Sequence, residues 1–268
     1  MPVRRMGSLA GLEGIVHAVT TRHGGVSGGP YATLNLGLHV GDAAEAVLEN
    51  RRRVCEEVEV ELDSLVAGAQ VLGNAVARVT AADRGRGARE QASALPDTDA
   101  LITDSPGVVL AAFSADCPLI AIVEPRRRAI GLAHASRRGT LGQVAARTVR
   151  AMARLLGCDP SAMVAAIAPS IGPCCYEVGE EVVEDARREL AEADQFFVRR
   201  DGRLYLDLWA ANVEQLVEAG LERERVEPPS VCTRCRSEEF FSYRAAGGPT
   251  GRFAVLLGLR TQNVKRKT

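Results

Sequence analysis

Histidine is scarce in this chain, which has four histidines among 268 residues. A multicopper oxidase would need about ten imidazoles, because imidazole is the usual ligand of copper in such centres. The composition therefore excludes a copper oxidase of that kind. Any site that depends on histidine must be small, and each histidine has to be considered individually.

An excess of charge of one sign is also missing, since 33 basic residues face 34 acidic ones. Without a strongly basic surface to attract nucleic acid, a small-molecule partner is the better expectation. Lysine occurs only in the C-terminal stretch "NVKRKT". We interpret that stretch as a solvated terminus.

A long uninterrupted apolar run is the third thing lacking. The longest run, Gly107 to Val123, carries Asp116 and Pro118 near its centre, where a membrane-spanning helix would tolerate them poorly. It predicts two buried strands with a polar break. The N-terminal segment has no apolar core behind its arginines, so we expect no secretory signal and a cytoplasmic protein with seven reduced cysteines.

The pattern along the chain predicts an α+β fold in one domain, residues 1–268, with a core of about 14–260 and a sheet flanked by helices. A run of apolar positions after Asp42 predicts a helix. Asp-Gly between two alternating runs predicts a hairpin within 196–208. The remaining expectations are strands near 100–103, 108–114, 119–123 and 130–135, a strand pair within 64–80, a hairpin within 238–259, and helices near 141–156, 179–193 and 208–220.

Cys117 and His134 stand at or near the ends of predicted buried strands, where their side chains can converge. Thiolate and imidazole are preferred zinc ligands, and the same pair can serve as a nucleophile and its base. Spacing alone favours a third interpretation, a buried thiol with a hydrogen-bonded histidine. Asp116 shifts the balance towards function, because a carboxylate in an apolar run is costly unless it is paired or functional.

The stretch "CTRC", Cys232 to Cys235, is the one C-x-x-C in the sequence. A structural zinc site would need a second pair, and the adjacent Cys174 and Cys175 have the wrong spacing to be assumed its partner. We therefore expect both cysteine pairs to be packed locally.

Several blocks of sequence, taken together, resemble the signature motifs of the YfiH-like proteins, also called laccase-domain or polyphenol oxidase proteins, purine nucleoside phosphorylases and peptidoglycan editing factors. The resemblance covers about residues 14–260. The blocks are "TTRHGGVSGGPYATLNLGLHVGD", "DALITDSPGVVLAAFSADCP", "AIGLAHASRRGTL", "APSIGPCCYEVGEEV", "LDLWAANVEQL" and "FFSYRAAGGPTGR".

The resemblance implies a central mixed sheet flanked by helices, like that of a cytotoxic deamidase toxin, and a zinc site of two histidines and one cysteine. It also implies phosphorolysis of purine nucleosides, deamination of adenosine and, in some bacterial members, amide cleavage in a cell-wall precursor. A three-ligand zinc keeps an open position for water or substrate. In phosphorolysis phosphate would be the nucleophile, with Arg22 and Arg51 steering the anion.

By the same resemblance, Cys117 falls on the zinc cysteine and His134 on one zinc histidine. The third ligand belongs in a "Q-V-H-G" motif, which reads Gln70-Val71-Leu72-Gly73 in this chain. Leu72 has no donor atom, so the chain resembles a divergent member that lacks one zinc ligand. In the block that opens with His134, Ser136 replaces the usual glycine and Arg137 the usual tryptophan.

Three hypotheses follow. The first is a purine nucleoside phosphorylase and adenosine deaminase with a weakened zinc site, in which His39 or His23 substitutes for the missing imidazole. The second is an inactive or repurposed paralogue in which Arg137 binds a small anionic ligand. The third is a metal-independent amidohydrolase that uses Cys117 and His134.

Overall fold

The strands of the computed structural model, which describes residues 3–190 and 192–261, form two larger sheets and a small third one. The five-stranded sheet has the order β1 (Val3–Arg4), β2 (Ile15–Thr20), β14 (Phe253–Leu259), β6 (Val109–Ser114), β3 (Leu65–Ala67). The six-stranded sheet has the order β13 (Val226–Glu227), β9 (Val164–Ile167), β7 (Leu119–Glu124), β8 (Ala129–His134), β5 (Ala100–Thr103), β4 (Val76–Arg78). The small sheet has the order β10 (Glu177–Val178), β12 (Arg203–Leu206), β11 (Phe197–Arg200).

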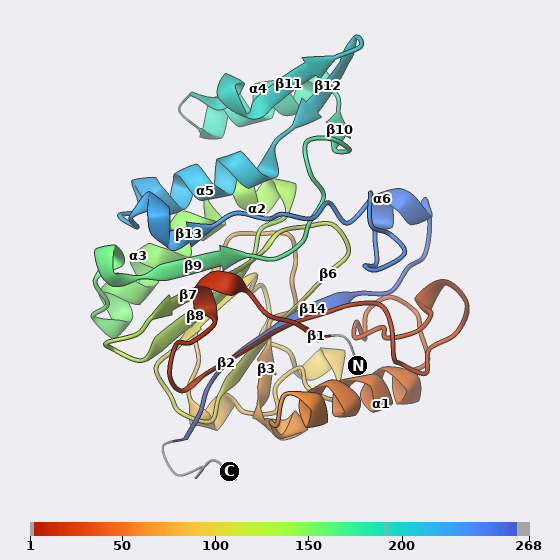
Figure 1. Ribbon diagram of the computed structural model, residues 1–268, viewed down its shortest axis with the longest axis vertical. Coiled ribbons are helices and arrows are strands. Elements are labelled where there is room, and N and C mark those ends of the chain that lie inside the picture. Colours follow the sequence, from red (N-terminus) through yellow and green to blue (C-terminus); the bar gives the residue numbers. More distant parts are fainter. Residues whose placement is uncertain (1–2, 191, 262–268) are drawn as a thin grey trace.

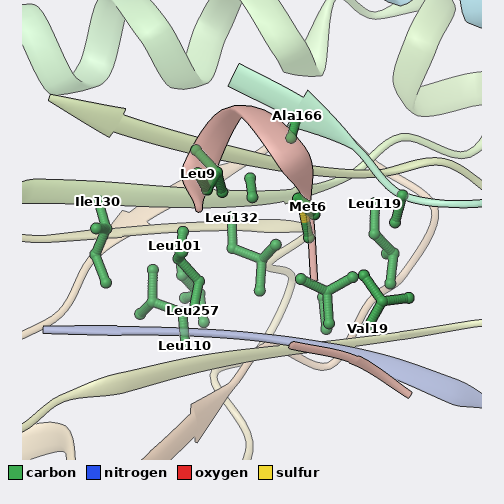
Figure 2. Close-up of a cluster of buried hydrophobic side chains, with 14 of the residues drawn as sticks. Met6, Leu9, Val19, Leu101, Leu110, Leu119, Ile130, Leu132, Ala166 and Leu257 are labelled. Carbon is green, nitrogen blue, oxygen red and sulfur yellow. The ribbon is translucent and has the colours of Figure 1, made fainter. Parts of the chain in front are cut away.

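The two larger sheets pack face to face, and their inner faces form the main core (Figure 1). Leu110 and Leu257 of one sheet meet Leu101 and Leu132 of the other in this layer (Figure 2). Strands β6, β7 and β8 are buried along their whole length, because each is covered on both faces. This explains why their sequences are continuous apolar runs rather than alternating ones.

Helices cover the outer faces of both sheets (Figure 1). Helix α1 (Ala44–Glu57) packs on the five-stranded sheet, while α3 (Val144–Leu156) and α5 (Leu208–Glu218) cover the six-stranded sheet. Helix α4 (Glu180–Glu189) lies beside the small sheet, beyond α5. The short helices α2 (Arg137–Leu141) and α6 (Tyr243–Ala246) follow His134 and precede β14, respectively.

The expected α+β class is confirmed, as are the two strands around the polar break at 115–118 and the hairpin of β11 and β12. The single central sheet that was expected is instead two sheets packed against each other. The helix expected over 141–156 begins later, at Val144, because Gln143 before it adopts a left-handed φ of 60°; Leu141 instead ends the preceding helix α2. Within the described residues, no helix is long and apolar enough to cross a membrane.

Two sequence predictions of strand pairing were wrong. Strands β3 and β4 do not pair with each other, since β3 lies beside β6 in one sheet and β4 beside β5 in the other. The predicted hairpin over 238–259 is instead α6 followed by a single long strand, β14, which lies between β2 and β6. In both cases the strand pairs with strands that are distant in the sequence and not with the neighbouring segment.

Buried His17 on β2 should make the stability of the protein depend on pH. Its Nδ1 accepts a hydrogen bond from the Met6 amide at 3.3 Å, and burial, then the positive charge of Arg5, lower its pKa from 6.5 to about 4. The unfolded chain therefore binds more protons below pH 6.5, and stability should fall as the pH drops from about 6.5 to about 4.

The His17→Asn variant keeps an acceptor for the Met6 amide but cannot titrate. Relative to this variant, the wild type should lose about 1–2 kcal/mol of unfolding free energy between pH 7 and pH 4.5, after allowance for solvent screening. Urea unfolding at the two pH values measures the difference. Equal losses in both proteins would contradict the assignment.

Candidate functional site

The loop between β6 and β7 passes from one large sheet to the other and carries Cys117. His134 ends β8, directly opposite Leu119 at the start of β7. This register brings the two residues predicted from the sequence together, and the Cys117 thiol interacts with the His134 ring. Cys117 is half-buried and His134 is buried.

Asp99 is a site residue that the sequence interpretation missed. It precedes β5, and because Ala100 pairs with Ala133 on the antiparallel β8, Asp99 stands opposite His134. The His134 amide donates to the Asp99 carbonyl at 2.8 Å, and Nδ1 of the ring lies 2.9 Å from Oδ1 of the buried carboxylate. This contact fixes the orientation of the imidazole and leaves Nε2 for other partners. The only signal in the sequence was an acidic residue immediately before a buried strand.

The contact also changes the charge of the pair. Burial alone would lower the pKa of His134, but its hydrogen bonds with Asp99 and Cys117 outweigh that effect and raise the pKa to about 9. For Asp99, burial works to raise the pKa, whereas the hydrogen bond to His134 and those from backbone amides lower it overall. Both shifts favour a protonated imidazole held by an ionised carboxylate near neutral pH.

The Asp99 carboxylate also anchors the segment in which the family motif has its third zinc ligand. It accepts hydrogen bonds from the backbone amides of Val71 at 3.1 Å, Leu72 at 3.1 Å and Gly73 at 2.8 Å. The backbone at Leu72 is thus held beside the His134–Asp99 pair, in a left-handed conformation with φ of 63°. The leucine side chain is 44% exposed and offers no ligand atom.

A zinc ion of the three-ligand kind does not fit the residues present at this site. Among the residues that the structure describes, Cys117 and His134 do not belong to a group of three or more converging His, Cys, Asp or Glu ligands. A catalytic zinc needs three protein ligands, and here the third position is apolar. The proposed chemistry of this site therefore involves no metal at Cys117.

His39 and His23, the two histidines predicted as substitutes for the missing zinc ligand, differ in their surroundings. His39 is near enough to His134 for their charges to interact; although it is exposed, desolvation by surrounding atoms is the main reason that its pKa falls to about 4. His23 is an exposed residue whose charge acts on Glu238. Of the two, His39 is the one that the structure brings towards His134.

Three arginines lie near the Cys117 thiol or near Tyr176, which interacts with that thiol. Tyr176 interacts electrostatically with Cys117, Arg137 and Arg244, and the Arg244 guanidinium lies over the Tyr176 ring, 5.0 Å from its centre. Burial lowers the pKa of Arg252, and the charge of Cys117 acts against this shift. The side chains of Arg244 and Arg252 also donate to backbone carbonyls, those of Glu177 and of Thr250 and Gly251 respectively. Their positive charges, together with that of Arg137, make the site suited to an anion. Of the three arginines, the sequence interpretation had singled out Arg137 alone.

The other two predicted anion-binding arginines have structural contacts. The buried Arg51 donates to the carbonyl groups of Leu36, Gly87 and Ala88, and its guanidinium lies 4.3 Å from the centre of the Phe113 ring. Such contacts favour a role in holding loops rather than the predicted contact with a substrate.

Arg22 likewise donates to the carbonyls of Ala32 and Ser237. Its guanidinium lies over the Phe241 ring, 4.8 Å from the ring centre. Arg22 therefore connects the glycine-rich segment to the C-terminal part of the chain, and its contacts, like those of Arg51, are structural.

Asp116, beside Cys117, is buried and fully engaged in ordering the site. Its carboxylate accepts from the Thr233 hydroxyl at 2.6 Å and from the Arg244 amide at 2.7 Å. These partners, rather than Arg137, compensate its burial. The Cys117 loop is thus tied to two segments from the C-terminal part of the chain.

The two cysteine pairs, which the sequence predicted to be packed locally and did not link to each other, lie together in the structure. The sulfur atoms of Cys174, Cys175, Cys232 and Cys235 all lie within 4.8 Å of one another and form a group that could hold a metal ion. Sequence spacing did not reveal this convergence because it depends on the tertiary structure.

Comparisons with known proteins agree with this fold over nearly the whole chain. The family model described as multi-copper polyphenol oxidoreductase laccase matches residues 16–260. The purine nucleoside phosphorylase YlmD of Geobacillus stearothermophilus is 42% identical over 93% of this chain and 92% of its own length. The adenosine deaminase RL5, from an unknown prokaryotic organism, is 36% identical over 88% of this chain and 91% of its own.

Among solved structures, that of the Bacillus licheniformis hypothetical protein YfiH superposes with a TM-score of 0.90. It is 34% identical and covers 97% of this chain and 99% of that chain. The resemblance to YfiH-like proteins expected from the sequence motifs is thereby confirmed.

Proposed function

The chain belongs to the family described as multi-copper polyphenol oxidoreductase laccase, and from this membership we propose that it is an enzyme of the purine nucleoside phosphorylase and adenosine deaminase type with an incomplete zinc site. The supporting observation is the array of Asp99, His134 and Cys117, with the positive charges of Arg137, Arg244 and Arg252 near Cys117 or its neighbour Tyr176. In this proposal His134 is a proton donor next to a site for an anion.

In phosphorolysis, an oxygen of phosphate attacks C1′ of the nucleoside while the bond from C1′ to the purine nitrogen breaks. Arginine side chains would hold the phosphate and orient it, since guanidinium groups bind phosphate through paired hydrogen bonds. The departing purine leaves more readily when it is protonated. The His134 imidazolium, oriented by Asp99, would donate that proton.

Arg137 tests the anion-binding part of this proposal, because its neighbour Arg138 on α2 provides a matched control. Arg137 is half-buried and interacts with Tyr176, whereas Arg138 is exposed. The Arg137→Gln variant should raise KM for phosphate about tenfold, the loss of one charge-assisted hydrogen bond, while Arg138→Gln should leave it unchanged. Steady-state release of base from inosine at varied phosphate measures both. Equal KM values for phosphate in the two variants would contradict a role for Arg137 in binding phosphate.

A second candidate is metal-independent amide hydrolysis, which the order Asp99–His134–Cys117 favours. A thiol next to an imidazole that is itself oriented by a carboxylate has the arrangement of an activated nucleophile. Cleavage of an amide in a cell-wall precursor that resists chelators and disappears in the Cys117→Ala variant would support this candidate. Phosphate-dependent cleavage of inosine supports the first proposal, and binding of phosphate without turnover of either substrate supports an inactive anion-binding paralogue.

A further inference from the structure

Four cysteine side chains meet at the surface beside the candidate site, contributed by two turns that are distant in the sequence. Cys174 and Cys175 belong to the turn that follows β9, and Cys232 and Cys235 to the turn that follows β13. All four are free thiols.

The spacing of the sulfur atoms matches a tetrahedral metal centre. Four zinc–sulfur bonds of about 2.3 Å place the sulfur atoms about 3.8 Å apart. The Cys235 sulfur lies 3.7 Å from that of Cys174 and 3.4 Å from that of Cys175, and no pair in the group exceeds 4.8 Å. These distances are far longer than the disulfide bond length of about 2.05 Å.

Backbone amides already support negative charge on the buried member of the group. The Gly172 amide donates to the Cys232 sulfur at 3.3 Å, and the Cys235 amide donates to the same sulfur from within the C-x-x-C turn. Hydrogen bonds of this kind stabilise a metal-bound thiolate. The positive charge of Arg200, which donates to the Cys174 carbonyl at 3.0 Å, would also favour a centre with a net negative charge.

The backbone holds the two turns side by side. The Ser170 amide donates to the Val231 carbonyl at 3.2 Å, and the Thr233 amide donates to the Ser170 carbonyl at 3.1 Å. The cysteine positions are therefore preorganised rather than brought together by chance side-chain rotations. Preorganisation lowers the cost of assembling a metal site.

We propose that Cys174, Cys175, Cys232 and Cys235 bind one zinc ion as a structural centre that fixes the wall of the candidate site. The same two turns contribute residues to that wall. Thr233, inside the C-x-x-C turn, donates to Asp116 next to Cys117, and Tyr176, adjacent to Cys175, faces the arginines. A four-thiolate centre leaves no open position, so this zinc orders structure and performs no chemistry.

Metal analysis of the full-length protein, purified with reductant and dialysed against a weak chelator, tests the proposal. The wild type should retain about one zinc per chain, and the Cys174→Ser/Cys235→Ser variant, changed at two exposed positions, should retain less than about a tenth of it. The matched control Cys55→Ala/Cys158→Ala removes two buried thiols outside the group and should retain the zinc.

A His134→Gln variant separates this site from the one at Cys117, since it should keep its zinc whether or not the proposed nucleoside chemistry is correct. Cobalt substitution gives a second readout, with intense thiolate-to-cobalt charge-transfer bands in the wild type and none in the double serine variant. If that variant fails to fold, the single Cys235→Ser change should weaken zinc binding at least about tenfold. A wild type that binds no zinc when reduced, zinc lost on His134→Gln, or zinc retained by the double serine variant would each overturn the proposal.

Discussion

The His134→Gln variant should lose about 1,000-fold in kcat for release of base from inosine, within the range that general acid catalysis contributes. Glutamine can still hydrogen-bond to Asp99, so the orientation of the loop should survive. It cannot carry a proton to the departing purine. Single-turnover experiments measure the rate of base release, and the circular dichroism spectrum of the variant shows whether it is folded.

The matched control is His17→Asn, which also replaces a buried histidine but lies on β2, outside the candidate site. It should keep the wild-type kcat near neutral pH. Comparable losses in the two variants would show that the effect of His134 is one of folding and would contradict its role as a proton donor.

The Leu72→His variant should create a second metal site, with zinc affinity at Cys117 and His134 at least about 100-fold above that of the parent protein. Structural zinc binding is worth about 10–16 kcal/mol over four ligands, so one ligand accounts for about 3 kcal/mol, or about 100-fold. The backbone is ready for this change, because Asp99 holds the Leu72 amide and also the His134 ring. Histidine also tolerates the left-handed conformation at this position better than leucine does.

Zinc titration in the Cys174→Ser/Cys235→Ser background measures this site alone. Val71→His is the matched control, because Val71 is a similarly exposed neighbour whose amide contacts the same carboxylate. A gain in affinity for Leu72→His but not for Val71→His is expected. If Leu72→His binds zinc no better than its parent, the site has diverged beyond the loss of one ligand.

The local sequence pattern was sufficient to predict those parts of the fold that depend on local interactions. The buried strands β6, β7 and β8 follow from apolar runs separated by turn residues, and the hairpin of β11 and β12 follows from Asp201-Gly202, both of which take positive φ angles. Pairing between distant strands was not predictable in this way. Strand β14 joins β2 and β6, and nothing in its own sequence specifies those partners.

The same distinction between local and long-range interactions applies to the residues of the candidate site. Cys117 and His134 were identified from strand ends and family motifs, and the structure brings them into contact. Asp99 and Arg252 were missed because their roles depend on the register of β5 with β8 and on the path of the chain into β14. The thiol cluster was missed for a related reason, since backbone hydrogen bonds between two distant turns create it.

The most direct test of the proposed function is the identity of the products formed from inosine in the presence of phosphate. Phosphorolysis predicts hypoxanthine and ribose 1-phosphate in equal amounts. Phosphorus NMR measures the ribose 1-phosphate, and the rate of its formation should fall to zero as phosphate is removed. Hypoxanthine formed with free ribose and no dependence on phosphate, or no hypoxanthine from a folded protein that binds phosphate, would contradict the account.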